Sequence, residues 1–268
     1  MPNIHANSIN IYYETYGKGE PIVFVAGFSG DHTAWQNVIE TYAEHYQVIV
    51  FDNRGIGRTD CPNFPYTTEM LANDAISLLK ALKLGPAHFI GHSFGGCIVQ
   101  MIAYKYPEFV KSIVLSCSIP HFSERARLYA EARLELMKAG APQASIVKFI
   151  TLLCWSEKYL SKPGMAEKLV QNGFFPMTVT GYEGQMHAVM TFDSRDWLSK
   201  IKCPCLVMAG DDDILATEAD GKIISQAITN AEFYCFKDVG HVPHIEQPEL
   251  FNHLVLQFLS KQKTDKRK

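Results

Sequence analysis

The sequence lacks the features that mark membrane proteins and disulfide-rich secreted proteins. No apolar run approaches the roughly 18 residues that a membrane-spanning helix needs, and the first residues, MPNIHANSIN, have no basic start followed by an apolar core. Seven cysteines cannot all pair, and their spacing fits neither a disulfide framework nor Cys-x-x-Cys zinc ligation. We therefore expect a soluble, cytoplasmic protein in a reducing compartment, with no membrane contact and no metal.

The chain also lacks a strong excess of charge of either sign. Its 268 residues carry a net charge of −3, and the one basic cluster, KQKTDKRK at the C-terminus, has neither interleaved aromatic residues nor a helical stripe. We interpret this cluster as a solvated tail, and we expect no nucleic-acid partner. A hydrophobic content of 47% is enough for one large core, so one domain with an insertion is predicted.

Short runs of apolar and β-branched residues recur along the chain and predict strands that are buried on both faces. The runs are SINIYYETYG, PIVFVAG, YQVIVFD, AHFIGHS, KSIVLSCS, CLVMAGDD and AEFYCFKD. Helical patterns lie between them, over about 32–45, 68–84, 95–106, 221–229 and 248–261. This alternation predicts an α/β fold with a mostly parallel central sheet and helices on both faces. The first two runs are expected to form an antiparallel edge hairpin that turns at Gly17 to Gly19.

The alternation is interrupted between residues 119 and 200, where no strand-like run occurs. SERARLYAEARLELMKAG in this segment has a helical pattern, with Ser123 as an N-cap and Gly140 as a C-terminal stop. A helical insertion that leaves after one strand and returns to the sheet at Ile201 would lie over one end of the sheet. We therefore predict a core of residues 1–118 and 201–268 and a helical lid of residues 119–200.

The stretch HFIGHSFGG places a serine between two glycines at the end of a predicted strand. A strand that ends at Ile90 and turns at once into a helix would strain the backbone of Ser93 and leave little room for side chains at positions 91 and 95. The turn would expose the Ser93 hydroxyl at the carboxyl end of the sheet, where open α/β sheets bind ligands. The plain alternative is a helix start with a serine cap and glycine packing.

A serine nucleophile needs a base and an acid that orients the base. Among ten histidines, His241 follows the last predicted strand in the loop DVGHVPHIEQPELF and is the expected base, with His244 as the weaker candidate. The acid is expected after CLVMAG, where Asp211, Asp212 and Asp213 follow one another and residue chemistry does not choose among them. Three adjacent carboxylates could also form only a turn.

Two backbone N–H groups are expected to receive the developing oxyanion. The Phe94 N–H lies at a predicted helix N-terminus directly after Ser93, and the Phe28 N–H follows Gly27 in the loop after PIVFVAG.

The remaining pocket candidates are histidine, aromatic and methionine side chains. His32 is interpreted as a helix-start or pocket-rim residue, and His92 as pocket wall or solvent-exposed rather than as the base. The candidates from the insertion are Trp155, Phe174, Met177, Met186 and Met190. They predict a substrate that is apolar near the scissile bond, although such residues in helices more often serve ordinary packing.

The sequence resembles the α/β-hydrolase fold superfamily, in the group of small bacterial carboxylesterases, 3-oxoadipate enol-lactonases, pimeloyl-carrier methyl-ester esterases and cofactor-free haloperoxidases. The resemblance covers residues 9–118 and 197–260 and rests on GHSFGG, FDNRGIGRTD, DWLSKIKCPCLVMAGDDD and GHVPHIEQPELF. It implies that Asp213 is the acid and His241 the base. Serine rather than aspartate at position 93 disfavours dehalogenase and epoxide hydrolase activity.

Two positions depart from many members of that family. Ala26 precedes Gly27 where a histidine is common, and Thr59 replaces the serine that ends the motif in FDNRGIGRTD. The backbone donor of the first loop is retained, but the neighbouring hydrogen-bond support is lost.

The motifs and the resemblance together imply a serine esterase or lactonase that acts on a small, apolar carboxylic ester or lactone through an acyl-enzyme, without a cofactor. One alternative is a carbon–carbon bond hydrolase of dienoic ring-cleavage products, and another is a ligand-binding receptor with slow turnover. A pimeloyl-carrier esterase would need a basic lid, whereas Arg125, Arg127 and Arg133 are interspersed with acidic residues. The sequence leaves the oligomeric state open between monomer and homodimer.

Overall fold

The computed structural model describes residues 2–173 and 177–264, whose strands form one mixed sheet. The strands are β1 (Asn3–Ala6), β2 (Ile9–Tyr16), β3 (Pro21–Val25), β4 (Gln47–Phe51), β5 (Ala87–His92), β6 (Val110–Ser116), β7 (Cys205–Gly210) and β8 (Glu232–Phe236). Their order is β1-β2-β4-β3-β5-β6-β7-β8, and every pair from β4 to β8 is parallel. The prediction of a mostly parallel sheet is therefore confirmed.

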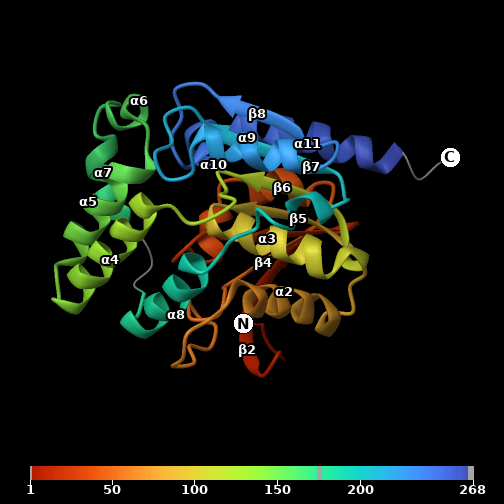
Figure 1. Ribbon diagram of the computed structural model, residues 1–268, viewed down its shortest axis with the longest axis horizontal. Coiled ribbons are helices and arrows are strands. Elements are labelled where there is room, and N and C mark those ends of the chain that lie inside the picture. The colour runs from red at the N-terminus through yellow and green to blue at the C-terminus, as the bar shows by residue number, and fades with distance from the viewer. Residues whose placement is uncertain (1, 174–176, 265–268) are drawn as a thin grey trace.

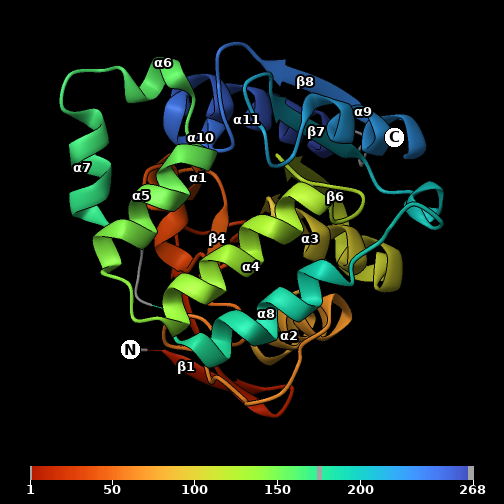
Figure 2. The same cartoon turned by 60° about the vertical axis from the view of Figure 1, so that its left-hand side comes forward.

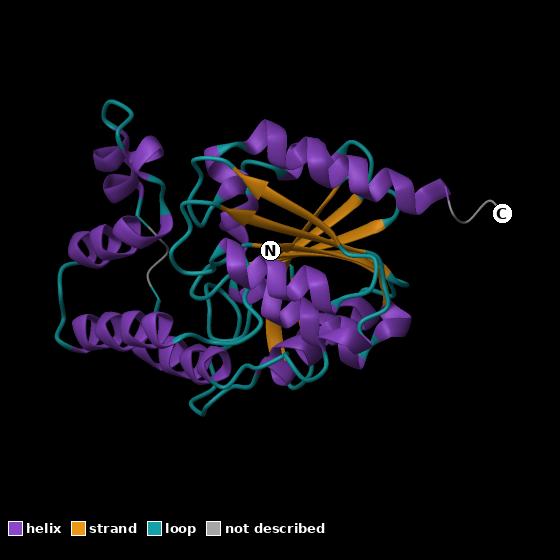
Figure 3. Cartoon of the chain, turned by 45° about the horizontal axis from the view of Figure 1, so that its top comes forward, coloured by secondary structure: helices purple, strands orange, loops and turns teal. Residues whose placement is uncertain are grey.

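Helices cover both faces of this sheet (Figure 3). Strand side chains alternate between the faces: Val23 and Val25 of β3 pack in one apolar cluster, and Ile22 and Phe24 pack in the other. The first cluster is closed by α2 (Thr68–Ala81), α3 (Phe94–Lys105) and α9 (Glu218–Ala227). The second is closed by the 3-10 turn η1 (His32–Trp35), α1 (Ile39–Ala43) and α11 (Pro248–Thr264).

Among the described residues, five α-helices lie between β6 and β7 in the chain, and they stand beside one end of the sheet (Figure 1). They are α4 (Glu124–Lys138), α5 (Gln143–Cys154), α6 (Glu157–Leu160), α7 (Met165–Asn172) and α8 (Val179–Met190). The Ser123 hydroxyl caps α4 by accepting the Ala126 N–H, and Gly140 follows the helix in the left-handed region at φ +67°. Helices α4 and α8 lie side by side (Figure 2).

The remaining short elements are 3-10 turns and one short helix in the connections. They are η2 (Pro107–Phe109), η3 (Leu198–Lys200) and α10 (Pro243–Glu246). Among the described residues, no helix is both long enough and apolar enough to cross a membrane.

Two local predictions were wrong. Strands β2 and β3 do not form a hairpin, because β4 lies between them and pairs with both. The edge hairpin is instead β1–β2, which turns at Asn7 and Ser8, both with positive φ. The helix expected over 32–45 is divided into η1 and α1. Both errors concern pairing or packing with distant segments, which local residue patterns do not encode.

Candidate active site

The site lies where the strand order reverses. From β3 the chain moves outward to β4, and it then returns to the other side of β3 to form β5. In open α/β sheets such a reversal leaves a crevice between the loops that follow the two strands, and ligands bind there. The loop after β3 and the turn after β5 meet at this point, since a Cβ added to Gly27 would lie 3.1 Å from the Ser93 Cβ.

Ser93 occupies a strained turn between β5 and α3. Its backbone has φ 54° and ψ −123°, a region that residues with side chains rarely adopt. The turn needs glycine on both sides: a Cβ at Gly95 would overlap the carbonyl oxygen of Val25, and one at Gly91 would overlap the backbone of Gly95. The Ser93 N–H donates to the Ser116 carbonyl oxygen at 2.8 Å, which anchors the turn to β6.

A hydrogen-bond chain leads from Ser93 to an aspartate. His241 Nε2 is 2.8 Å from Ser93 Oγ, and His241 Nδ1 is 2.7 Å from Asp213 Oδ2. Because a carboxylate only accepts, the Nδ1–H donates to Asp213, which leaves Nε2 unprotonated and able to accept the Ser93 hydroxyl proton. The other oxygen of Asp213 accepts the N–H groups of Leu215 and Ala216, at 2.8 and 3.0 Å. This arrangement can activate a hydroxyl as a nucleophile.

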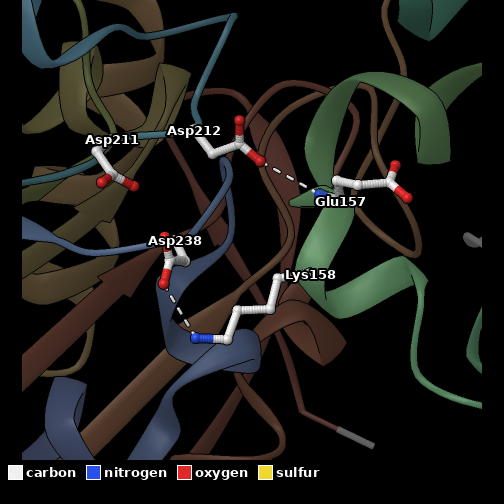
Figure 4. A pocket seen from close by; sticks show the side chains of 5 residues that line it. All are labelled: Glu157, Lys158, Asp211, Asp212 and Asp238. Carbon is white, nitrogen blue, oxygen red and sulfur yellow. Dashed lines mark hydrogen bonds and ion pairs between the residues drawn. The ribbon is translucent and has the colours of Figure 1, made fainter.

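The other two aspartates at the end of β7 have different partners. Asp211 Oδ1 accepts the Val239 N–H at 3.4 Å, and Asp212 Oδ2 accepts the N–H of Glu157 at 3.2 Å. Figure 4 shows both aspartates beside Glu157 and Lys158 of α6, and these side chains line a cavity of about 460 Å³. Of the three carboxylates, the one that contacts His241 is thus that of Asp213.

Side chains of the inserted helices hold the loop that contains Phe28. The Phe28 ring packs on the Tyr182 ring with centroids 4.7 Å apart, and the Ser29 N–H donates to Gln185 Oε1 at 3.1 Å. Ser29 has a positive φ of 62°, and Arg133 Nη1 donates to its hydroxyl at 2.6 Å. At the other side of Ser93, the Phe94 N–H is at the start of α3, where helix N–H groups have no acceptor within the helix.

Two further histidines are buried next to His241. His92 Nε2–H donates to the main-chain carbonyl oxygen of His241 at 2.7 Å, and the His244 ring packs against the rings of His92 and Trp35, both at 4.8 Å. Burial lowers the pKa of His92 well below its usual value, and burial lowers that of His244 to about 3, with the nearby histidines adding to both shifts. Both rings are therefore neutral at pH 7.

A cavity of about 810 Å³ opens at Ser93 and His241. Three of the sequence-predicted pocket residues line it, namely Gly27, His92 and Trp155, and so do Phe28 and Phe94. Phe174 lies outside the described residues. Four others are not among the described residues of the lining: His32, Met177, Met186 and Met190.

The structure corrects the placement of His32 and the methionines. The His32 backbone N–H and its ring Nδ1 both bond to Asp52 Oδ1, at 2.8 and 2.6 Å, which draws the ring away from the cavity. Gln185 and Val189 lie on the buried, inward face of α8. Met186 and Met190 each come one residue later, which rotates them by about 100° around the helix axis. Met186 and Met190 therefore lie off the inward face, and Met190 packs against the core.

Within the described part of the chain, two groups of three side chains bring potential metal ligands within 4.8 Å of one another: Asp31, His32 and Asp52, and Cys117, Asp213 and His241. In each group the histidine Nδ1 is already engaged by an aspartate, at 2.6 Å for His32 and Asp52.

Arg133 lines the cavity from α4, although its sequence context predicted only a scattered lid arginine and no place in the site. The signal was present in its spacing: Ala126, Ala130 and Arg133 are the buried residues of α4, at helical intervals of four and three. An arginine on the buried face of an amphipathic helix is unusual enough to mark a candidate.

Comparison with known proteins finds similarity over nearly the whole chain. A family model described as alpha/beta hydrolase fold matches residues 20–248. The 3-oxoadipate enol-lactonase 2 of Acinetobacter baylyi is 28% identical over 265 residues, which cover 95% of this chain and 97% of that protein. The structure of Est816, described as an N-acyl homoserine lactone degrading enzyme, has a TM-score of 0.84 at 28% identity and covers 96% of this chain and 100% of that chain. A thermophilic esterase from Thermogutta terrifontis has a TM-score of 0.88 at 25% identity, with coverages of 98% and 99%.

Proposed function

Because the chain belongs to the alpha/beta hydrolase fold family, we propose that it is a serine hydrolase of small carboxylic esters or lactones. The observation that carries the proposal is the hydrogen-bond chain from Ser93 through His241 to Asp213 at the mouth of a cavity. The similar proteins named an enol-lactonase, an N-acyl homoserine lactone degrading enzyme and an esterase support this bond type. Two of these names refer to a lactone, which is a cyclic ester, and the third refers to an ester.

In the proposed acylation step, Ser93 Oγ attacks the carbonyl carbon while its proton passes to His241 Nε2. Asp213 holds the imidazole in the required tautomer and stabilises the imidazolium that forms. The N–H groups of Phe28 and Phe94 receive the oxyanion, and each such donor contributes about 3 kcal/mol to transition-state stabilisation. The tetrahedral intermediate then collapses, and the leaving alcohol takes the proton from His241.

In the proposed deacylation step, water attacks the acyl-enzyme while His241 accepts a proton from the attacking water. The second tetrahedral intermediate expels Ser93, which regains its proton from His241, and the carboxylic acid product leaves. The neutral rings of His92 and His244 do not compete for the proton at pH 7, because burial keeps the pKa of each below the usual value for histidine.

We also propose that residues 119–200 act as a lid that shapes the substrate cavity. Helices α4, α5, α7 and α8 all contribute residues to its lining. Apolar side chains such as Ile119, Phe122, Ile150 and Val189 line much of it, which favours a substrate with an apolar part next to the ester carbonyl.

The test is hydrolysis of p-nitrophenyl esters from acetate to laurate by the wild type and by Ser93→Ala. We expect the wild type to favour short acyl chains, and we expect the substitution to lower kcat by about 10⁴-fold or more, since the nucleophile is lost. Circular dichroism and thermal unfolding of both proteins check that the variant is folded.

Turnover that survives in folded Ser93→Ala would contradict the mechanism. Failure of the wild type on every ester and lactone, together with turnover of a dienone, would move the assignment to the carbon–carbon bond hydrolases. Binding without turnover of either class would indicate a receptor.

A further inference from the structure

Arg133 places a positive charge in the wall of the cavity that contains Ser93. It lies on the buried face of α4, only 5% of its surface is exposed, and it lines the cavity together with Tyr129 of the same helix. A fully charged guanidinium is rarely buried to this extent unless an acid pairs with it.

The partners of Arg133 within the described residues are neutral. Nη1 donates to the Ser29 hydroxyl at 2.6 Å, the guanidinium carbon lies 4.9 Å from the centre of the Tyr182 ring, and buried Nε has no hydrogen-bond partner. No carboxylate of the described chain lies within ion-pair distance of it. Arg54, which is also buried, differs in this respect, because Asp74 accepts two of its N–H groups at 2.7 and 2.9 Å.

Two other charged side chains of the cavity lining, Asp31 and Lys168, do not form an ion pair with Arg133 in the described part of the chain. Oδ1 of Asp31 accepts the N–H and the hydroxyl of Thr33, at 2.9 and 2.5 Å, as the cap of η1, and its buried Oδ2 has no hydrogen-bond partner among the described residues. Lys168 is exposed to water, so its charge is largely screened. Among the residues that the structure describes, Arg133 is thus a buried cation that faces the cavity without an ionic partner.

The charge of Arg133 reaches other side chains of the cavity wall. Burial raises the pKa of Tyr129 and of Cys154 to about 12 in each case, and the positive charge of Arg133 opposes both increases. Its positive charge is therefore close to the part of the lining that α4 and α5 contribute.

We propose that Arg133 binds a carboxylate carried by the substrate, so that the enzyme acts on esters or lactones of acids that bear a second, free carboxylate. This inference rests on the proposed hydrolase function and names its substrate class. A carboxylate would supply the charge that the guanidinium lacks, and the guanidinium fork matches its two oxygens. The apolar lining would hold the carbon chain between the anionic group and the scissile bond at Ser93.

The experiment compares two p-nitrophenyl esters of equal chain length, the mono-ester of hexanedioic acid and the ester of hexanoic acid. The readout is the ratio of their kcat/KM values, anionic over neutral, in the wild type, Arg133→Met and Arg127→Met. Arg127 is the matched control, because it lies on the same helix but is partly exposed and pairs with Glu124 and Glu131. Removing a charged hydrogen-bond partner predicts a ratio about 10- to 100-fold lower in Arg133→Met, and an unchanged ratio in Arg127→Met.

Ser29→Ala separates anion binding from a purely structural role of Arg133. If the arginine only fixed the loop of Phe28, loss of its bond to Ser29 and loss of the arginine itself would slow both esters alike. We expect Ser29→Ala to leave the ratio at the wild-type value, whereas Arg133→Met lowers it.

A binding measurement makes the result independent of turnover. Calorimetric titration of Ser93→Ala with monomethyl hexanedioate should give a Kd at least about 10-fold tighter than that of Ser93→Ala/Arg133→Met. Serine-dependent turnover with the same ratio in the wild type and Arg133→Met would overturn this inference and leave the hydrolase function standing. If the wild type hydrolyses neither ester, the hydrolase function fails, and equal Kd values for the two titrated proteins would then overturn the anion site as well.

Discussion

At the scale of single residues, the direction of one side chain separates Asp213 from its two neighbours. Asp213 reaches His241 with one oxygen and accepts two N–H groups with the other, whereas Asp211 accepts a backbone N–H from the loop after β8 and Asp212 accepts one from the start of α6. In a run of three identical residues the sequence contains no signal for this difference, and only the resemblance to a family singled out Asp213. The histidine and the serine were easier to predict, because each stands in a loop directly after a recognisable strand.

Substitution of the three aspartates is expected to have two different outcomes. Asp213→Asn should lower kcat by about 10³- to 10⁴-fold, because an amide no longer favours the tautomer with the proton on His241 Nδ1. Asp211→Asn and Asp212→Asn keep an oxygen that can accept the same backbone N–H, so both should stay within about threefold of the wild type. Steady-state kinetics on one short-chain ester measure all three, and a loss at Asp212→Asn as large as that at Asp213→Asn would contradict this assignment.

At the scale of elements, the positions of the strands and helices were predictable, because buried parallel strands are continuous apolar runs. Their partners were not, as the hairpin expected between β2 and β3 shows: β4, which lies between them, comes later in the chain. Pairing is decided by contacts between distant segments, and a single sequence does not report them.

At the turn from β5, α3 approaches β3 closely, which makes Gly95 sensitive to a single methyl group. A Cβ there would overlap the backbone oxygen of Val25, so Gly95→Ala must move α3 or Ser93 and should destabilise the fold by about 1–3 kcal/mol or more. Gly85→Ala is the control, since its Cβ would have no atom within 4 Å. There we expect no loss, or a gain of about 0.4–1 kcal/mol from the stiffer unfolded chain. Urea unfolding measures both, and equal midpoints would refute the argument.

At the scale of the whole molecule, the cavity is formed between the sheet and the inserted helices, and its lining depends on which face of each helix turns inward. The sequence predicted apolar and methionine residues for the lining, but α8 presents Val189 and keeps Met186 and Met190 outside it. The cavity also contains a buried arginine that composition does not suggest. The loops that follow strands were therefore more predictable than the lid, because the sheet edge fixes where those loops lie.

The same assembly buries two histidines, which predicts how the stability of the whole molecule depends on pH. His92 is the last residue of β5, His244 lies in α10 and Trp35 lies in η1, so these rings meet only when the chain is folded. Burial depresses the folded-state pKa of both histidines, to about 3 for His244, whereas the usual value is 6.5. Between those values the unfolded chain binds the proton and the folded chain does not. Their contribution to stability is therefore present above pH 6.5 and is lost as the pH falls towards the folded-state pKa.

The size of this effect can be isolated with one substitution, His244→Phe, which keeps an aromatic ring beside Trp35 and Phe251. Each buried histidine should lower the free energy of unfolding by about 1.4 kcal/mol per pH unit below pH 6.5. Urea unfolding of both proteins at steps from pH 8 to pH 5 gives the difference between their free energies of unfolding. That difference should be constant above about pH 7 and should then shift in favour of the variant, with a slope that approaches about 1.4 kcal/mol per pH unit below pH 6.5. If the difference stayed constant over the whole pH range, His244 would take up its proton within the folded protein. The cluster formed by the rings of His92, His244 and Trp35 would then open without global unfolding.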